Sequence, residues 1–243
     1  MGTVFSLTVV DVVDPLAVAA VFDWLREVDE RFSTYRPESE ISRLGRAELA
    51  PADLSADARE VLALCERARI ITGGWFDIRR HRTDGVPDPS GLVKGWAIER
   101  AAAMLTAAGV RNWTLSGGGD VVTRGTREGL PWRVGIQDPA SAAHLSVVLE
   151  PGDAAVATSG LYERGGHIVD PHTGRVPTEL LSMTVVGPSM TWADTYATAA
   201  FAMGEAGLGW LAGMPGYSAG AVTADGRLLV TPGFRRLIAD PNG

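Results

Sequence analysis

Residues 112–138 read NWTLSGGGDVVTRGTREGLPWRVGIQD and place short extended runs directly one after another. The run NWTLS leads into three glycines and an aspartate, and a hairpin-like segment with further glycine turns follows. Strands joined by such short turns pair antiparallel, because a parallel pair needs a long crossover connection. This stretch therefore predicts an antiparallel sheet rather than the regular strand-helix alternation of a doubly wound fold.

Helical patterns lie on both sides of that stretch. In residues 15–32 the apolar side chains recur at 18, 21, 22, 25, 28 and 32, which predicts a helix that begins at Asp14-Pro15. A second long helix is expected after Ser55, a suitable N-cap, and ends at Gly73-Gly74. Residues 92–109 and 192–204 also have helical spacing, and TYRPESEISRLG (34–45) predicts a turn with a short helix.

Further strands are expected after residue 140, at LSVVLE (145–150), AAVAT (154–158), HIVD (167–170) and SMTVVG (182–187), with a terminal hairpin around ADGR (224–227). Residues 77–91 are charged, rich in proline and glycine and aperiodic, so they predict a loop. The mixed order of helices and strands predicts an α+β fold, with a mainly antiparallel sheet packed by helices, in a single domain over 1–243.

Composition narrows the classes of partner. The formal net charge is -7 with acids and bases mixed along the chain, so no basic surface for nucleic acid is expected. A single cysteine, Cys65, excludes an internal disulfide and a multi-cysteine metal cluster, and its helical position predicts burial. No apolar run is long enough to span a membrane, and the apolar start lacks a basic leader, so a cytoplasmic location is expected.

The segment TWADTYATAAF places Asp194 and Thr198 four residues apart on a predicted helix, where both side chains project from one face. A carboxylate and a hydroxyl are hard oxygen donors that suit Mg²⁺ or Ca²⁺ better than zinc. The alternative is a purely structural role, which is commoner for such spacing alone. In it Asp194 interacts favourably with the helix dipole, and the Thr198 hydroxyl hydrogen-bonds to a carbonyl of the preceding turn.

Two glycine-containing segments could approach a phosphate. In DPSGLVKGWAIER the start of a helix offers free N–H groups, to which Lys94 in the first turn adds a positive charge. In SGGGDVV three glycines allow positive φ and close approach to a flat ligand. The alternatives are a solvated Lys94 and a tight turn that Asp120 caps.

Aromatic side chains stand in two turns. Tyr35, Trp75 and Phe76 could flank a planar ring, although core packing is the simpler interpretation for Trp75 and Phe76. The segment VATSGLYERGGHIVDPHTG (156–174) contains small and polar residues around His167. Asp170 or a main-chain carbonyl could orient this histidine as a proton acceptor. A purely structural histidine is the alternative, and Ser159 lacks the G-x-S-x-G context of a nucleophile.

Eight segments, taken in order, resemble the ApbE family of FAD:protein FMN transferases. They are MGTVFSLTV, RFSTYRPESEISRLG, GGWFDI, GLVKGWAIERA, LSGGGDVV, WRVGIQDP, VATSGLYERGGHIVDPHTG and TVVGPSMTWADTYATAAFAMG. Together they span nearly the whole chain. The resemblance implies an ApbE-like fold and Mg²⁺-dependent transfer of the FMN half of FAD to a threonine hydroxyl of a target protein, with release of AMP.

The resemblance also implies roles for individual residues. Asp194, Thr198 and the main-chain carbonyl of Gly91 fall on the metal ligands, and His167 falls on the proton acceptor. Contacts to the flavin nucleotide fall on Met1, Tyr35, Trp75, Phe76, Asp77, Asp88, Lys94, Gly118, Ser159, Arg164, His167 and Ile168.

Two other functions use the same residues. Water in place of the threonine would make the protein a metal-dependent FAD pyrophosphatase that yields FMN and AMP. Loss of turnover would leave a protein that binds FAD without releasing AMP.

Overall fold

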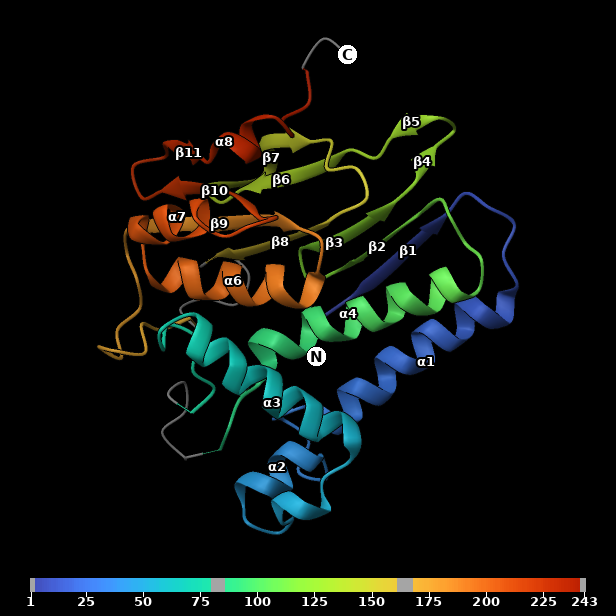
Figure 1. Ribbon diagram of the computed structural model, residues 1–243, viewed down its shortest axis with the longest axis vertical. Helices are drawn as coiled ribbons and strands as arrows, with labels where there is room; N and C mark the ends of the chain where they lie inside the picture. Colours follow the sequence, from blue (N-terminus) through green and yellow to red (C-terminus); the bar gives the residue numbers. More distant parts are fainter. Residues whose placement is uncertain (1–2, 80–85, 161–167, 241–243) are drawn as a thin grey trace.

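The computed structural model describes residues 3–79, 86–160 and 168–240 (Figure 1). Its main sheet has seven strands in the order β1-β2-β3-β8-β9-β10-β11, and every neighbouring pair is antiparallel. The strands are β1 (Phe5–Val9), β2 (Trp113–Gly117), β3 (Asp120–Arg124), β8 (Ala155–Gly160), β9 (Leu180–Gly187), β10 (Ser218–Thr223) and β11 (Leu228–Val230). The expected antiparallel sheet of an α+β fold is confirmed.

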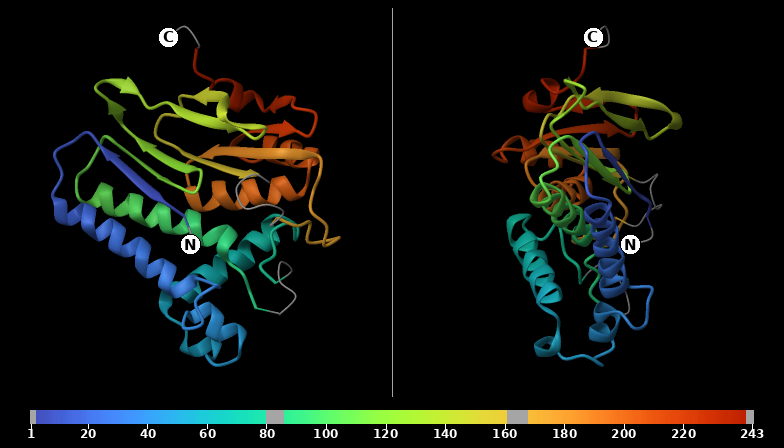
Figure 2. Two further views of the ribbon diagram at one scale, coloured as in Figure 1. Left: turned by 180° about the vertical axis from the view of Figure 1, so that it is seen from behind. Right: turned by 90° about the vertical axis from the view of Figure 1, so that its right-hand side faces the viewer.

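Helices cover one face of this sheet. Those of the first half are α1 (Pro15–Phe32), α2 (Glu40–Gly45), the 3₁₀ turn η1 (Pro51–Asp53), α3 (Ala56–Ile71) and α4 (Ser90–Ala107), and those of the second are α6 (Met190–Ala202) and α7 (Glu205–Ala212). The last helix, α8 (Pro232–Arg235), lies on the opposite face. Helices α4 and α6 lie side by side beneath the strands, and α1 packs along α4 (Figures 1 and 2). Their contact faces form the main hydrophobic core.

The other face of the sheet is partly covered by a two-stranded ribbon, β6 (Val134–Asp138) and β7 (Ser141–Leu149), together with α8. Val156 and Val186 of the sheet pack there against Phe234 of α8. Strand β8 is buried at every residue, because both of its faces are covered. A short hairpin of β4 (Thr126–Arg127) and β5 (Leu130–Pro131) extends from β3.

Local signals set the helix boundaries as the sequence predicts. The Asp14 carboxylate accepts the N–H of Leu16 at 2.9 Å and caps α1, and the Ser55 hydroxyl accepts the N–H of Ala58 at 3.2 Å and caps α3. Gly73 and Gly74 follow α3 with φ of 63° and 89°, a conformation that favours glycine. Cys65 is buried as expected, and burial raises the pKa of its thiol.

Two predictions about local structure are wrong. Residues 168–170 of the expected HIVD strand form no strand, because Asp170 closes a turn: its carboxylate accepts the N–H of His172 and the hydroxyl of Thr173, at 2.8 and 2.6 Å. Lys94 lies in the second turn of α4 rather than the first, because the helix begins at Ser90. No helix among residues 3–79, 86–160 and 168–240 is long and apolar enough to cross a membrane.

Candidate active site

The site is built where α4 crosses α6. At the crossing point Gly95 of α4 donates its main-chain N–H to Oδ2 of Asp194 at 2.9 Å. A Cβ atom on Gly95 would lie 2.7 Å from the carbonyl oxygen of Met190 and 2.9 Å from Cβ of Asp194. Only glycine allows the two helices to approach this closely, and the approach fixes the position of the Asp194 carboxylate.

Lys94 joins two buried carboxylates. Its Nζ lies 3.3 Å from Oδ1 of Asp194 and also forms an ion pair with Oδ2 of Asp120, which follows the glycine turn between β2 and β3. Asp194 is 3% exposed and Asp120 fully buried, so both charges sit within the protein interior. Burying charge is expensive unless it is paired, so this cluster stands out from the apolar packing around it and marks a candidate functional site.

The three positions expected to hold a metal lie together. Thr198 is one turn beyond Asp194 on α6, and its Oγ1 lies 3.3 Å from Oγ of Ser159 on β8. A Cβ on Gly91 would be 3.7 Å from Cγ2 of Thr198 and 3.2 Å from the ring of Phe76. The first turn of α4 therefore meets the face of α6 that carries Asp194 and Thr198, with Phe76 buried beneath.

These donors fit Mg²⁺. Among the described residues no group of three or more histidine, cysteine or acidic side chains could hold a metal ion. A carboxylate, a hydroxyl and a main-chain carbonyl are hard oxygen donors, and Mg²⁺ keeps few protein ligands while water and phosphate fill its remaining positions.

The glycine turn of residues 117–119 borders the same cluster. Gly118 has φ of 54°, and a Cβ there would lie 3.4 Å from Cδ of Lys94 and 2.9 Å from Oγ1 of Thr3. The segment forms a tight turn between the paired strands β2 and β3, which was one of the two interpretations of the three glycines. Asp120 does more than cap that turn, because its Oδ1 also faces the N–H of Thr158 at 3.3 Å while Oδ2 pairs with Lys94.

The expected nucleotide contacts on the 75–88 segment lie beside α4. Phe76 is buried in the core, whereas Trp75 is half-buried and its ring centroid lies 4.5 Å from that of His172. Asp77 accepts the N–H of Arg79 at 2.9 Å, and Asp88 accepts the N–H of Ser90 at 3.1 Å just before α4. Both carboxylates thus order the chain on either side of residues 80–85.

The remaining predicted residues divide into three groups. Ser159 and Ile168 are buried, and Ser159 touches Thr198. Tyr35 is 90% exposed in the connection between α1 and α2. Met1, Arg164 and His167 lie outside the described residues.

Two residues that sequence reasoning did not assign to the site belong near it. Asp120 pairs with Lys94 across 26 positions of sequence, and His172 packs on Trp75 from the turn that Asp170 closes. Burial raises the pKa of Asp170, but the hydrogen bonds from Thr173 and His172 outweigh it, so that the pKa lies below its usual value. The position of Asp120 directly after three glycines was the sequence feature that could have assigned it to the site.

Comparison with known proteins gives a consistent result. The family model described as "ApbE family" matches residues 1–83 and 80–219. FAD:protein FMN transferase of Vibrio cholerae is 28% identical, with 84% of this chain and 80% of the relative covered. The protein of the same name from Rhodobacter capsulatus is 38% identical over 78% of this chain, which corresponds to 38% of the relative.

Solved structures share the fold. Flavin transferase ApbE from Vibrio cholerae superposes with a TM-score of 0.81 at 26% identity, covering 98% of this chain and 96% of the other. An ApbE protein from Thermotoga maritima gives the same TM-score at 21% identity, covering 98% and 96%. The expected family is therefore confirmed, and the chain belongs to the ApbE family.

Proposed function

We propose that this protein is a FAD:protein FMN transferase that moves the FMN half of FAD to a threonine hydroxyl of a target protein with Mg²⁺, releasing AMP. The observation that carries the proposal is the convergence of Gly91, Asp194 and Thr198 beside the Lys94 ammonium. Membership of the ApbE family, and the names of the relatives above, support the same reaction.

The reaction balances as a phosphoryl-group transfer. The threonine oxygen forms a bond to the phosphorus on the FMN side of the diphosphate, and the bond from that phosphorus to the bridging oxygen breaks. AMP leaves with the bridging oxygen, and the hydroxyl proton passes to a base. Attack on an anionic diphosphate requires its charge to be offset and the nucleophile to be deprotonated.

Lys94 performs the first task within this chain. Its side chain is 15% exposed and its ammonium is held by Asp120 and Asp194, so it presents a positioned charge near the turn at Gly118. Asp194, Thr198 and the carbonyl of Gly91 would hold Mg²⁺ at the same place. When bound, that ion supplies further charge neutralisation on the phosphoryl oxygens.

His167 is the proposed proton acceptor, on the strength of its place in the family motif. A general base of ordinary efficiency contributes on the order of 10² to 10⁴ in rate. Trp75 and the buried Phe76 would border the bound nucleotide, with Trp75 held by its contact with His172.

The test is to incubate the protein with FAD and Mg²⁺, with and without an acceptor protein, and to measure AMP and the flavin fluorescence that stays on the denatured acceptor. Transfer predicts both products in equal amounts and only with acceptor. Rapid release of free FMN and AMP without acceptor would instead establish a pyrophosphatase, and FAD binding without AMP at any Mg²⁺ concentration would establish a binding protein.

A further inference from the structure

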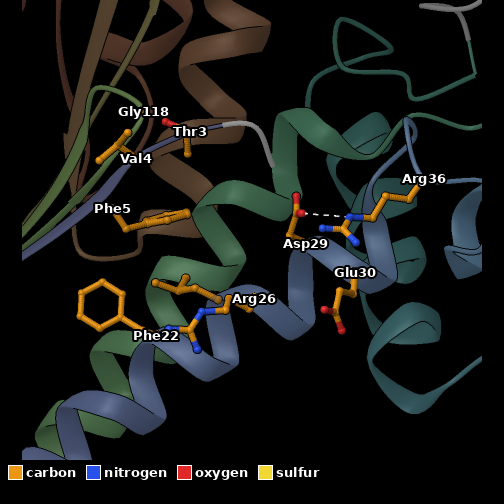
Figure 3. A pocket seen from close by; sticks show the side chains of 10 residues that line it. Thr3, Val4, Phe5, Phe22, Arg26, Asp29, Glu30, Arg36 and Gly118 are labelled. Atoms are coloured by element: carbon orange, nitrogen blue, oxygen red, sulfur yellow. Dashed lines mark ion pairs between the residues drawn. The ribbon is translucent and has the colours of Figure 1, made fainter.

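A cavity lies beside the proposed active site, between the start of β1 and the helix α1 (Figure 3). Its volume is about 880 Å³. Phe5 and Phe22 face the space from the strand and the helix, and charged side chains of α1 and the following turn form its rim. The lining residues are Thr3, Val4, Phe5, Phe22, Leu25, Arg26, Asp29, Glu30, Arg36 and Gly118.

This cavity lies at the start of β1, the first strand in the order of the sheet. Strand β1 is the first in the order of the seven-stranded sheet and pairs with β2 alone among the described strands. Val10 donates its N–H to the carbonyl of Asn112 at 2.9 Å, and by the alternation of an antiparallel ladder Ser6 and Thr8 also bond toward β2. The main-chain groups of Phe5, Leu7 and Val9 therefore point away from β2.

The sequence of β1 contains none of the residues that usually prevent another strand from pairing with an edge strand. The strand reads FSLTV, without the lysine, proline or inward charge that usually prevents strands from adding to an edge. Helix α1 packs along α4 and leaves the cavity between itself and β1. Val4 is 85% exposed at the end of the strand nearest the glycine turn.

One end of this edge lies beside Gly118, which neighbours the side chain of Lys94. Thr3 and Gly118 line the cavity, and a Cβ atom added to Gly118 would lie 3.4 Å from Cδ of Lys94. A chain that follows β1 toward Thr3 would come close to Gly118 and to the Lys94 side chain that packs against it. The reaction proposed above needs a protein hydroxyl at that place, and an unpaired strand edge is a common way to bind an extended peptide.

We propose that the free edge of β1 binds the acceptor protein as an added strand. This inference rests on the proposed function and names how its protein substrate is held. The bound segment is extended, bonds to the main chain of Phe5 and Leu7, places an apolar side chain between Phe5 and Phe22, and delivers its threonine at the end formed by Thr3 and Gly118.

The first test uses an array of synthetic ten-residue peptides with one fixed threonine and randomised flanks, incubated with FAD and Mg²⁺ and scored by flavin fluorescence. The best peptide is then resynthesised with a single N-methyl group at each position in turn. Strand addition predicts that methyl groups at alternate positions lower kcat/KM at least tenfold, whereas those between them change it less than threefold. Equal effects at all positions, or transfer to a folded acceptor but to no peptide, would overturn the inference.

A second test uses two exposed valines. Val4→Lys places an edge-blocking lysine in the cavity, and Val12→Lys makes the same change at a fully exposed site outside it. We expect the KM for peptide to rise at least fivefold in the first variant and to stay within twofold in the second. An unchanged KM in Val4→Lys, or a rise confined to the Kd for FAD, would assign the cavity to something other than the acceptor.

The two proposals fail differently. If AMP is never formed, the transferase itself is refuted. If AMP and flavinylated acceptor are formed with neither alternation in the N-methyl series nor sensitivity to Val4→Lys, only the strand-addition mode is refuted.

Discussion

The N–H of Gly95 donates to Oδ2 of Asp194 across the contact of α4 and α6, at 2.9 Å. This bond, together with the ion pair of Lys94 and Asp194, links the helix that carries Gly91 and Lys94 to the helix that carries Asp194 and Thr198. The absence of a Cβ at Gly95 is what lets the bond form, since any side chain would clash with the carbonyl of Met190. Gly95 therefore contributes both to the packing of these helices and to the position of Asp194.

Gly95→Ala is expected to destabilise the protein and to lower its activity together. Forcing a methyl group into this contact costs about 1–3 kcal/mol, and separation of the helices moves Asp194 away from Lys94. The matched control is Gly209→Ala in α7, where nothing lies within 4 Å of the added Cβ and a gain of about 0.5–1 kcal/mol is expected. Urea unfolding and AMP formation measure both. A Gly95→Ala protein of unchanged stability would contradict the close packing described here.

Thr198→Val is expected to lower AMP formation at least tenfold, with partial recovery at high Mg²⁺, because it removes an oxygen proposed to bind the ion. Thr195→Val is the matched change on the same helix, where the hydroxyl bonds to the carbonyl of Thr191 at 2.7 Å away from the site. It is expected to affect unfolding rather than turnover. Equal turnover in the two variants would remove Thr198 from the metal site.

Lys94 and Asp120 are expected to be energetically coupled. Removing the charge of Lys94 by Lys94→Met leaves two carboxylates buried without it, and loss of one partner of a buried pair typically costs about 3–5 kcal/mol. Adding Asp120→Asn should recover part of that loss in the double variant. Unfolding free energies of the four proteins give the coupling, and strictly additive values would show that the two side chains act independently.

An exposed ion pair provides the reference for that cycle. Arg26 and Asp23 are both largely exposed on α1, so Asp23→Asn is expected to change the free energy of unfolding by less than about 1 kcal/mol. A change as large as that of Lys94→Met would mean that burial does not explain the effect.

Asp11 is expected to give the protein a pH-dependent contribution to stability. The side chain of Asn112 and the main-chain N–H groups of Arg111 and Asn112 donate to its carboxylate and hold its pKa below the usual 3.8. A lowered folded-state pKa stabilises the protein above pH 3.8 and ceases to do so as the pH falls through the folded value.

Asp11→Asn should therefore lower Tm at neutral pH, and the difference from the unmodified protein should shrink below pH 3.8. Asp14→Asn serves as the control, because asparagine caps a helix about as well as aspartate. A Tm difference for Asp11→Asn that persists unchanged into acid would show that the carboxylate charge is not responsible.

The sequence was most informative where the determinants are local. Asp14, Ser55 and the glycines after α3 set helix ends through contacts within a few residues, and the four-residue spacing of Asp194 and Thr198 follows from helix geometry. The expected HIVD strand failed because Asp170 has nearby donors that compete with a strand ladder.

Contacts between residues that are far apart in the sequence could not be predicted in this way. The pairing of Asp120 with Lys94 and the packing of His172 on Trp75 depend on how β3, α4 and two loops meet in space. The open edge of β1 is likewise a property of the strand order, which no local pattern encodes. Family resemblance supplied roles for residues, and the fold supplied their proximity.

The most direct measurement is a crystal structure with FAD and Mn²⁺ in place of Mg²⁺, in which anomalous scattering locates the ion. We expect the ion to contact a carboxylate oxygen of Asp194 and the hydroxyl of Thr198 at about 2.1 Å, the short distance that Mg²⁺ requires, with the diphosphate of FAD completing its coordination. An ion bound elsewhere, or a diphosphate distant from Lys94, would contradict the site and the reaction proposed for it.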